Sequence, residues 1–141
     1  LTFIERATLF TFVPFRRTGL GLLGCTDNGD TTWGVSVFRA GDDNFGSDTG
    51  QPGGFALAAR ATHLIFDRND GNHLLHVGGA YHYNDPVGDR VRYATAPEFV
   101  LGSNIRGNTP VFVDSGTLVA DNHDVWGAEA AWVNHSFSVQ A

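Results

Sequence analysis

The sequence predicts an all-β protein made of long antiparallel strands. Stretches of alternating apolar and polar residues, each roughly ten residues long, follow one another along the chain. They end at turn sequences such as Asn28-Gly29, and Gly accounts for 18 of the 141 residues, which is unfavourable for helices. Alternation, turn chemistry and glycine content therefore agree on this fold class.

The first predicted hairpin surrounds the turn at residues 27–30, because Asn-Gly tolerates the positive φ angles of a tight turn. We expect one strand at residues 17–26 and a second at residues 31–40. In the second strand Trp33, Val35 and Val37 share one face. The Gly- and Asp-rich residues 41–54 cannot bury themselves and are expected to form a solvated loop.

A third strand is expected at residues 55–66 and a fourth at residues 73–84, joined by a polar turn at 67–72. The fourth strand has the clearest alternation in the chain. One face carries Leu75, Val77, Gly79, Tyr81 and Tyr83, and the other carries His76, Gly78, Ala80, His82 and Asn84. This pattern predicts a strand with one apolar and one polar face.

A fifth strand is expected at residues 124–133, followed by a turn at 134–136 and a last strand that starts at Phe137. Trp126, Ala128, Ala130 and Trp132 share one face of the fifth strand, while Gly127 and Glu129 share the other. The two Trp are ~20 Å apart along a strand, which suits the two aromatic girdles of a membrane barrel. Both rings filling the core of a soluble sandwich is the alternative.

The lengths of strands and connections favour a membrane barrel. The predicted strands have about 10 to 12 residues, whereas strands of soluble sheets usually have about 5 to 6 and tilted barrel strands about 9 to 11. Short turns alternate with long loops if residues 85–123 are one long loop, as in outer-membrane barrels. We therefore predict a segment of an antiparallel transmembrane β-barrel.

Composition excludes several other classes of protein. Nine Arg and no Lys stand against 15 acidic residues, and the resulting net charge of -6 argues against a nucleic-acid partner. A lone Cys25 provides neither a disulfide framework nor a Cys-based zinc cage. The longest uncharged stretch, residues 71–84, is too short for a transmembrane helix. The chain opens at Leu1 without a leader pattern, so we expect an internal piece of a longer protein.

Several motifs, taken in their order, resemble the phosphate-selective porin O and P family over essentially the whole chain. They are Phe3-Ile4-Glu5-Arg6-Ala7, Arg16-Arg17-Thr18-Gly19-Leu20-Gly21, Asp85-Pro86, Asp89-Arg90-Val91-Arg92-Tyr93, Phe112-Val113-Asp114-Ser115-Gly116-Thr117-Leu118, Gly127-Ala128-Glu129-Ala130-Ala131 and Phe137-Ser138-Val139-Gln140. The resemblance implies that residues 1–141 belong to a single barrel domain. They would supply roughly six strands from the middle of a 16-stranded porin.

The resemblance also implies where the protein works and with what. Residues 1–15 would end a loop folded into the lumen, residues 85–123 would form a second such loop, and barrels would assemble as homotrimers in the bacterial outer membrane. The channel would contact outer-membrane lipid and pass small anions, with phosphate as the specific candidate. No cofactor and no catalytic residue are expected, because a channel needs only a polar pore. The chain departs from the best-known anion-selective members in having no Lys.

Arginine is the residue type expected to carry anion transport, because its planar fork pairs with phosphate-like anions and stays charged. The predicted pore-lining and anion-binding residues are Arg6, Arg16, Arg17, Arg60, Arg90 and Arg92. Arg60 shares a strand face with Ala58 and Thr62, and turning it toward lipid would cost ~2 to 4 kcal/mol. Solvated charges paired with a nearby Asp are the alternative for the loop arginines.

The two faces of the predicted barrel wall follow from the same alternation. The outward face is expected to include Leu57, Leu75, Val77, Tyr81, Tyr83, Trp126 and Trp132. The inward face is expected to include Arg60, His76, His82 and Glu129. Within the lumen, an ion pair such as Glu5 with an Arg would brace a loop.

No metal site is predicted. His73 and His76 point to opposite faces of one strand, and His76 and His82 share a face but lie ~20 Å apart. The loop carboxylates of residues 42, 43 and 48 match no EF-hand spacing.

Two other functions are weighed against the channel. Residues 112–117 have the form of an aspartic protease loop around Asp114, and residues 48–50 offer a second Asp, but Asp48 lies in a polar loop instead of following an apolar strand. We therefore predict no enzyme. A soluble β-sandwich module that binds carbohydrate through Trp and Tyr is the main alternative, and it predicts a chain that folds alone in buffer.

Overall fold

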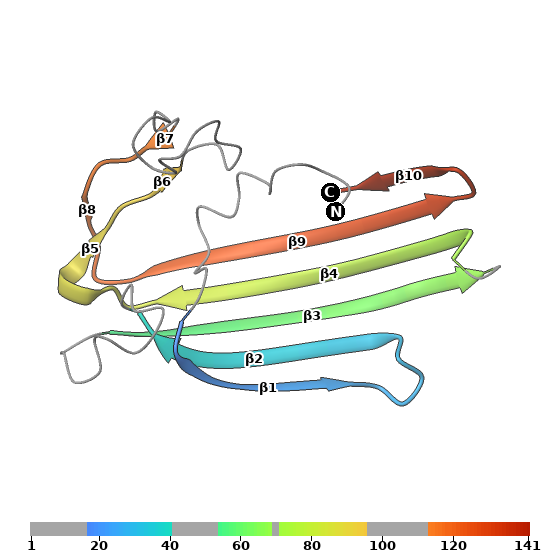
Figure 1. The fold of residues 1–141 in the computed structure, drawn as a ribbon, viewed down its shortest axis with the longest axis horizontal. Coiled ribbons are helices and arrows are strands. Elements are labelled where there is room, and N and C mark those ends of the chain that lie inside the picture. The colour runs from blue at the N-terminus through green and yellow to red at the C-terminus, as the bar shows by residue number, and fades with distance from the viewer. Residues whose placement is uncertain (1–16, 41–53, 69–70, 96–112) are drawn as a thin grey trace, which may run out of the picture.

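In the part of the chain that the structure describes, six antiparallel strands form one curved sheet (Figure 1). The computed structural model describes residues 17–40, 54–68, 71–95 and 113–141. The strands are β1 (Gly19–Cys25), β2 (Thr31–Arg39), β3 (Phe55–Arg68), β4 (His73–Asn84), β9 (His123–Asn134) and β10 (Phe137–Gln140). They are neighbours in that order, and the all-β antiparallel fold predicted from the sequence is confirmed.

Short turns join the strands at one end of the sheet, on the right in Figure 1. Gly29 has a φ of +76°, and the Thr26 hydroxyl donates a hydrogen bond of 2.6 Å to the Asn28 side chain. Gly71 has a φ of +86°, and its N–H donates to the Asp67 carboxylate at 2.8 Å. Glycine accepts these left-handed conformations without steric cost, so both turns form where the sequence predicts them.

Strand β3 is longer than predicted and contains a β-bulge. The ladder between β3 and β4 passes from Leu64–His76 directly to Phe66–Leu75, so Ile65 is inserted. An inserted residue breaks the period-two pattern that marks a strand in a sequence. The pairing nevertheless continues to Arg68, two residues beyond the predicted end of the strand.

The connection between β4 and β9 carries small elements of its own at the opposite end of the sheet. They are the 3-10 turn η2 (Val87–Asp89) and the two-residue strands β5 (Arg90–Val91), β6 (Ala94–Thr95), β7 (Val113–Asp114) and β8 (Leu118–Val119). Strand β5 pairs with β8, and β6 pairs with β7. Strands β4 and β9 pair with each other over their whole lengths, so this connection leaves and re-enters the sheet at the same end.

The main sheet has no packed core among the described residues, where Ala56 is the single fully buried apolar side chain. Large apolar side chains are exposed instead, such as Leu20 at 87% and Trp126 at 77% of their surface. A soluble sandwich would cover these side chains with a second sheet. The arrangement is therefore that of a barrel wall and not of the sandwich considered as the alternative.

Candidate pore-wall site

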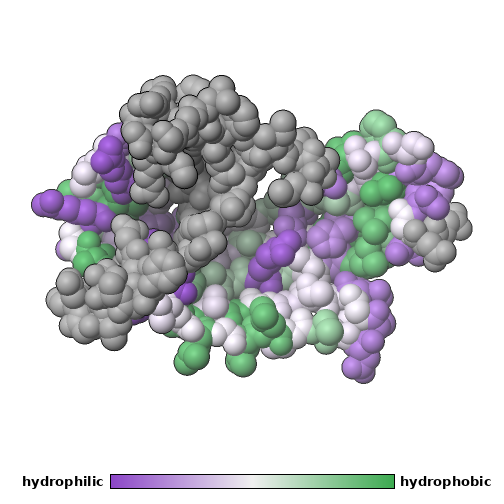
Figure 2. Space-filling model, viewed as in Figure 1, coloured by the Kyte–Doolittle hydropathy of each residue, from purple (hydrophilic) through white to green (hydrophobic). Residues whose placement is uncertain are grey.

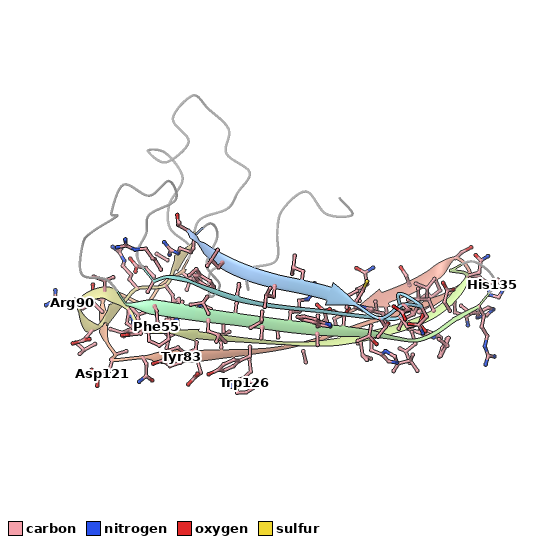
Figure 3. All side chains as sticks on the ribbon, turned by 90° about the horizontal axis from the view of Figure 1, so that it is seen from below. Phe55, Tyr83, Arg90, Asp121, Trp126 and His135 are labelled. Atoms are coloured by element: carbon pink, nitrogen blue, oxygen red, sulfur yellow. The ribbon has the colours of Figure 1, made fainter. Side chains whose placement is uncertain are left out.

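The strand registers divide the side chains of the sheet into two faces, as predicted. Leu75 lies opposite Trp132, and Tyr81 lies opposite Trp126, so the predicted outward residues of β4 and β9 share one face. Figure 3 shows Tyr83 and Trp126 on the convex side of the curved sheet. A convex apolar face suits contact with lipid.

The concave face is polar at its centre. Its side chains come from the alternate positions, and Figure 2, which looks onto this face, shows hydrophilic residues near the middle of the sheet. Arg60 in β3 lies opposite Ala80, and Glu129 in β9 lies opposite Gly78, so both charged side chains belong to this face. We call this concave side the inner face.

Arg60 and Glu129 form an ion pair that crosses β4. The guanidinium nitrogen Nη2 of Arg60 donates to both carboxylate oxygens of Glu129, at 2.6 and 2.8 Å. The two side chains remain 60% and 34% exposed, so the pair is in contact with water. Exposed pairs contribute only about 0 to 1 kcal/mol to stability, and the main effect of this one is to hold a positive and a negative group at fixed places on the wall.

Gly78 provides the surface on which the Glu129 side chain lies. A Cβ atom at position 78 would be 2.5 Å from Oε1 and 2.7 Å from Cγ of Glu129. Real Cβ atoms do not approach so closely, so any larger residue would displace Glu129 from this position. The absence of a side chain in β4 thus allows the bridge between β3 and β9.

A second ion pair lies in the connection between β4 and β9. Arg92 donates from Nε and Nη2 to the two carboxylate oxygens of Asp114, at 2.9 and 2.5 Å. The N–H of Gly116 adds a third hydrogen bond to Asp114, at 3.0 Å. Arg92 and this N–H lower the pKa of Asp114 from 3.8 to about 2, and the hydrogen bond to Asp114 raises the pKa of Arg92.

Ser115 fastens the same turn to the opposite strand segment. Its N–H donates to the Tyr93 carbonyl at 2.9 Å, and its hydroxyl accepts from the Tyr93 N–H at 3.0 Å. Gly116 has a φ of +66°, which completes the turn. The Asp-Ser-Gly sequence that resembles a protease loop is therefore a turn that holds Arg92 and Tyr93.

The predicted site residues are distributed over three regions. Arg60 lies on the inner face, Arg92 is bound to Asp114, and Arg90 is exposed at the end of the sheet opposite the short turns, where Figure 3 labels it. Arg17 borders a groove of about 340 Å³ whose floor includes Gly21, Ser36 and Ala58. Arg6 and Arg16 lie outside the described residues, as do Glu5 and the loop carboxylates 42, 43 and 48.

The partners of the two arginines were missing from the sequence prediction. Glu129 was placed on the inner face without its partner, because pairing with Arg60 depends on the register of three strands. For Arg92, pairing with a nearby Asp is the alternative that the sequence offers, and the structure shows that pairing, with Asp114 as the partner. The one available signal was the rule that charges facing each other on one sheet face tend to have opposite signs.

Long strands with a lipid-facing apolar side and a charged inner side define the wall of a transmembrane β-barrel channel. The family model described as phosphate-selective porin O and P matches residues 1–141, and the chain belongs to that family. This is a family of bacterial outer-membrane porins, which are channels and not enzymes. No curated protein and no solved structure matches the chain. Among the described residues, no helix is long and apolar enough to cross a membrane.

Proposed function

We propose that the protein is a passive diffusion channel for small anions in the outer membrane, with phosphate as the specific candidate, and that Arg60 contacts the passing anion. The family description supports phosphate. The observation that carries the proposal is the way in which Arg60 binds Glu129. Both hydrogen bonds use one guanidinium nitrogen, Nη2.

The remaining donors of Arg60 are available to an anion. A guanidinium group has five N–H donors, and 60% of this side chain is exposed. Glu129 fixes the orientation of the group and offsets most of its long-range charge. Conduction requires an ion to bind weakly enough to leave again, and an arginine paired with a carboxylate meets that requirement better than an isolated one.

The roles of the other arginines are proposed from the family resemblance and from their positions near the end of the sheet that carries the long connections. Arg17 and Arg90 lie near the long-connection end of the sheet, which is the outer side in outer-membrane barrels. We assign Arg6, Arg16 and Arg92 to the same entry region, in loops folded into the lumen. The apolar convex face would contact outer-membrane lipid, and the barrels would form homotrimers.

The test is planar-bilayer recording of the full-length porin under a chloride gradient, with inorganic phosphate added as a blocker. We expect a reversal potential that indicates anion preference and a chloride current that phosphate reduces. Arg60→Gln should weaken both effects. Arg68→Gln removes the same charge from the turn end of β3 and should leave them unchanged. A channel without anion preference, or equal effects of the two variants, would contradict the proposal.

A further inference from the structure

Two histidines lie next to each other on the inner face near the outer end of the sheet. His82 in β4 is opposite Val125, and His123 in β9 is opposite Asn84, two residues further along β4. The two side chains are therefore diagonal neighbours on adjacent strands and point to the same face. Their ring centres are 5.9 Å apart, and the ring planes are inclined by 62°.

This spacing fits two imidazoles that share one metal ion. Ring nitrogens bind zinc at ~2.0 to 2.1 Å, which places the two ring centres about 5 to 6.5 Å apart for the usual angles at the metal. Either nitrogen of each ring can be turned toward the ion by rotation of the ring. No movement of the two strands is required.

Both rings have buried nitrogens without a hydrogen-bond partner among the described residues. His82 is only 7% exposed, and within the described residues neither Nδ1 nor Nε2 of this ring has a hydrogen-bond partner. Nδ1 of His123 is also buried without a partner. Buried polar atoms are nearly always paired, so three unpaired nitrogens in two touching rings require an explanation.

The neighbouring aromatic rings fix the position of the pair. Phe38 stacks on His82 with ring centres 5.9 Å apart and planes inclined by 8°, and Tyr93 meets His123 edge-on at 5.8 Å. These contacts hold the imidazoles without occupying their nitrogens by hydrogen bonds. An ion between the two rings would pair one nitrogen of each of them.

We propose that His82 and His123 bind a divalent transition-metal ion such as Zn²⁺ at the outer end of the channel wall. Both ligands are neutral, so the bound ion keeps its double positive charge and its open positions take water or an anion. Within the described residues no group of three His, Cys, Asp or Glu side chains surrounds an ion. The site therefore has two protein ligands and exchanges its metal readily.

A second pair of neighbouring histidines lacks the ring spacing and the free nitrogens that a metal site needs. His73 and His135 lie at the turn end with ring centres 4.4 Å apart, which is too close for both rings to bind one ion. Nδ1 of His135 already has a hydrogen-bond partner, the Asn134 side chain, at 2.8 Å. Spacing and nitrogen availability thus distinguish the two pairs. The sequence did not show the first pair, because its members are on different strands.

The experiment is Cu²⁺ binding to the full-length porin in detergent, followed by electron paramagnetic resonance, since Cu²⁺ binds imidazole sites more tightly than Zn²⁺. We expect the splitting pattern of two nitrogen ligands and displacement of the copper by excess Zn²⁺. His82→Asn and His123→Asn should each lower copper affinity at least tenfold. His76→Asn, on the same strand and face but outside the pair, should retain wild-type affinity.

Each variant is checked by its electrophoretic mobility before and after heating and by its conductance without metal. If His82→Asn does not fold, His123→Asn alone decides, because His123 is the less buried of the two residues. Unchanged copper affinity in a folded His123→Asn protein would overturn the site. Anion preference in the absence of metal tests the proposed function separately, since it does not depend on this ion.

Discussion

The two Arg–carboxylate pairs in the part of the chain that the structure describes have similar exposure but different geometry. Arg60 and Glu129 are 60% and 34% exposed, and Arg92 and Asp114 are 57% and 36% exposed. Arg60 uses one nitrogen for its partner, whereas Arg92 uses two, in the side-on arrangement. Only Asp114 receives an additional backbone hydrogen bond.

The number of remaining donors is the same in both pairs, because each guanidinium has five N–H donors and uses two of them. What differs is the surroundings: one pair lies on an open strand face and the other closes a turn. Arg92 and Asp114 lie in a turn, and the neighbouring Ser115 ties the same segment to Tyr93. Arg60 is oriented by Glu129 but keeps most of its donors. The hydrogen-bonded turn around Arg92, and not exposure, is therefore the feature that distinguishes this arginine from Arg60, for which we propose the contact with the anion.

The largest effect is expected at the strand beneath the first pair. Gly78→Val places a side chain in the space of Glu129, so the pair breaks and the wall is strained, at a cost of about 1 to 3 kcal/mol. We expect a lower yield of folded barrel and a lower unfolding temperature by circular dichroism. Gly79→Ala is the control, because a Cβ there comes no closer than 3.8 Å to another atom. Equal losses of folded yield and unfolding temperature in both variants would show that the position of Glu129 does not depend on a glycine at position 78.

The second pair is tested by Asp114→Asn. The amide cannot accept the charged fork of Arg92 as a carboxylate does, so we expect faster amide hydrogen exchange at Tyr93 and Ser115 in the full-length porin. Asp121→Asn changes an exposed carboxylate in the same connection and should leave these amides unchanged. Unchanged exchange in Asp114→Asn would mean that the ion pair does not hold the turn.

The same turn is expected to depend on pH in a defined direction. The pKa of Asp114 is lowered from 3.8 to about 2 in the folded protein, so the carboxylate stabilises the turn above about pH 4. The stabilisation is lost as the pH falls through about 2. Protection of the Tyr93 amide should therefore be constant from neutral pH to about pH 4 and should fall below it. In Asp114→Asn this fall should be absent.

The smallest effect is expected for Ser115→Ala. The change removes the hydroxyl that accepts from the Tyr93 N–H and leaves the backbone bond of residue 115 in place. The Tyr93 amide loses its own acceptor, so the comparison is made at the amide of residue 115, whose bond to the Tyr93 carbonyl remains. One hydrogen bond contributes about 0.5 to 1.5 kcal/mol, so exchange at this amide should rise less than in Asp114→Asn. Thr117→Ala, at an exposed position just after the turn, is the control. A larger rise of exchange in Ser115→Ala than in Asp114→Asn would mean that the hydroxyl holds the turn more than the ion pair does.

The sequence predicted the strands well wherever turn residues and alternation coincide. Strand β4 has the predicted bounds, His73–Asn84, because Gly71 marks its start and every second side chain is apolar. The end of β3 was predicted too early, because Asp67 and Arg68 are polar and read as part of the turn, whereas both pair with β4. Local signals thus determine most strand bounds, and polar residues at a strand end are sufficient to hide one.

The sequence predicts on which face of the sheet a residue lies much better than it predicts which residue it contacts. Alternation places Arg60 and Glu129 on the inner face, but their pairing depends on the registers of β3 and β9 against β4. The pairs of Arg92 with Asp114 and of His82 with His123 join residues far apart in the sequence by contacts that follow no period. The positions of Arg6 and Arg16 stay predictions, because both residues lie outside the described part of the chain.

The most direct test of the pore-wall pair is the reversal potential of two opposite variants, Glu129→Gln and Arg60→Gln, in the full-length porin. A unit charge at ~4 Å in water contributes about 1 kcal/mol, or about a fivefold change in the permeability ratio. Glu129→Gln leaves Arg60 unopposed, so anion preference should increase and phosphate should block more tightly. Arg60→Gln should shift both in the opposite direction. Shifts of the same sign, or none in either folded variant, would contradict a role for this pair in selecting anions.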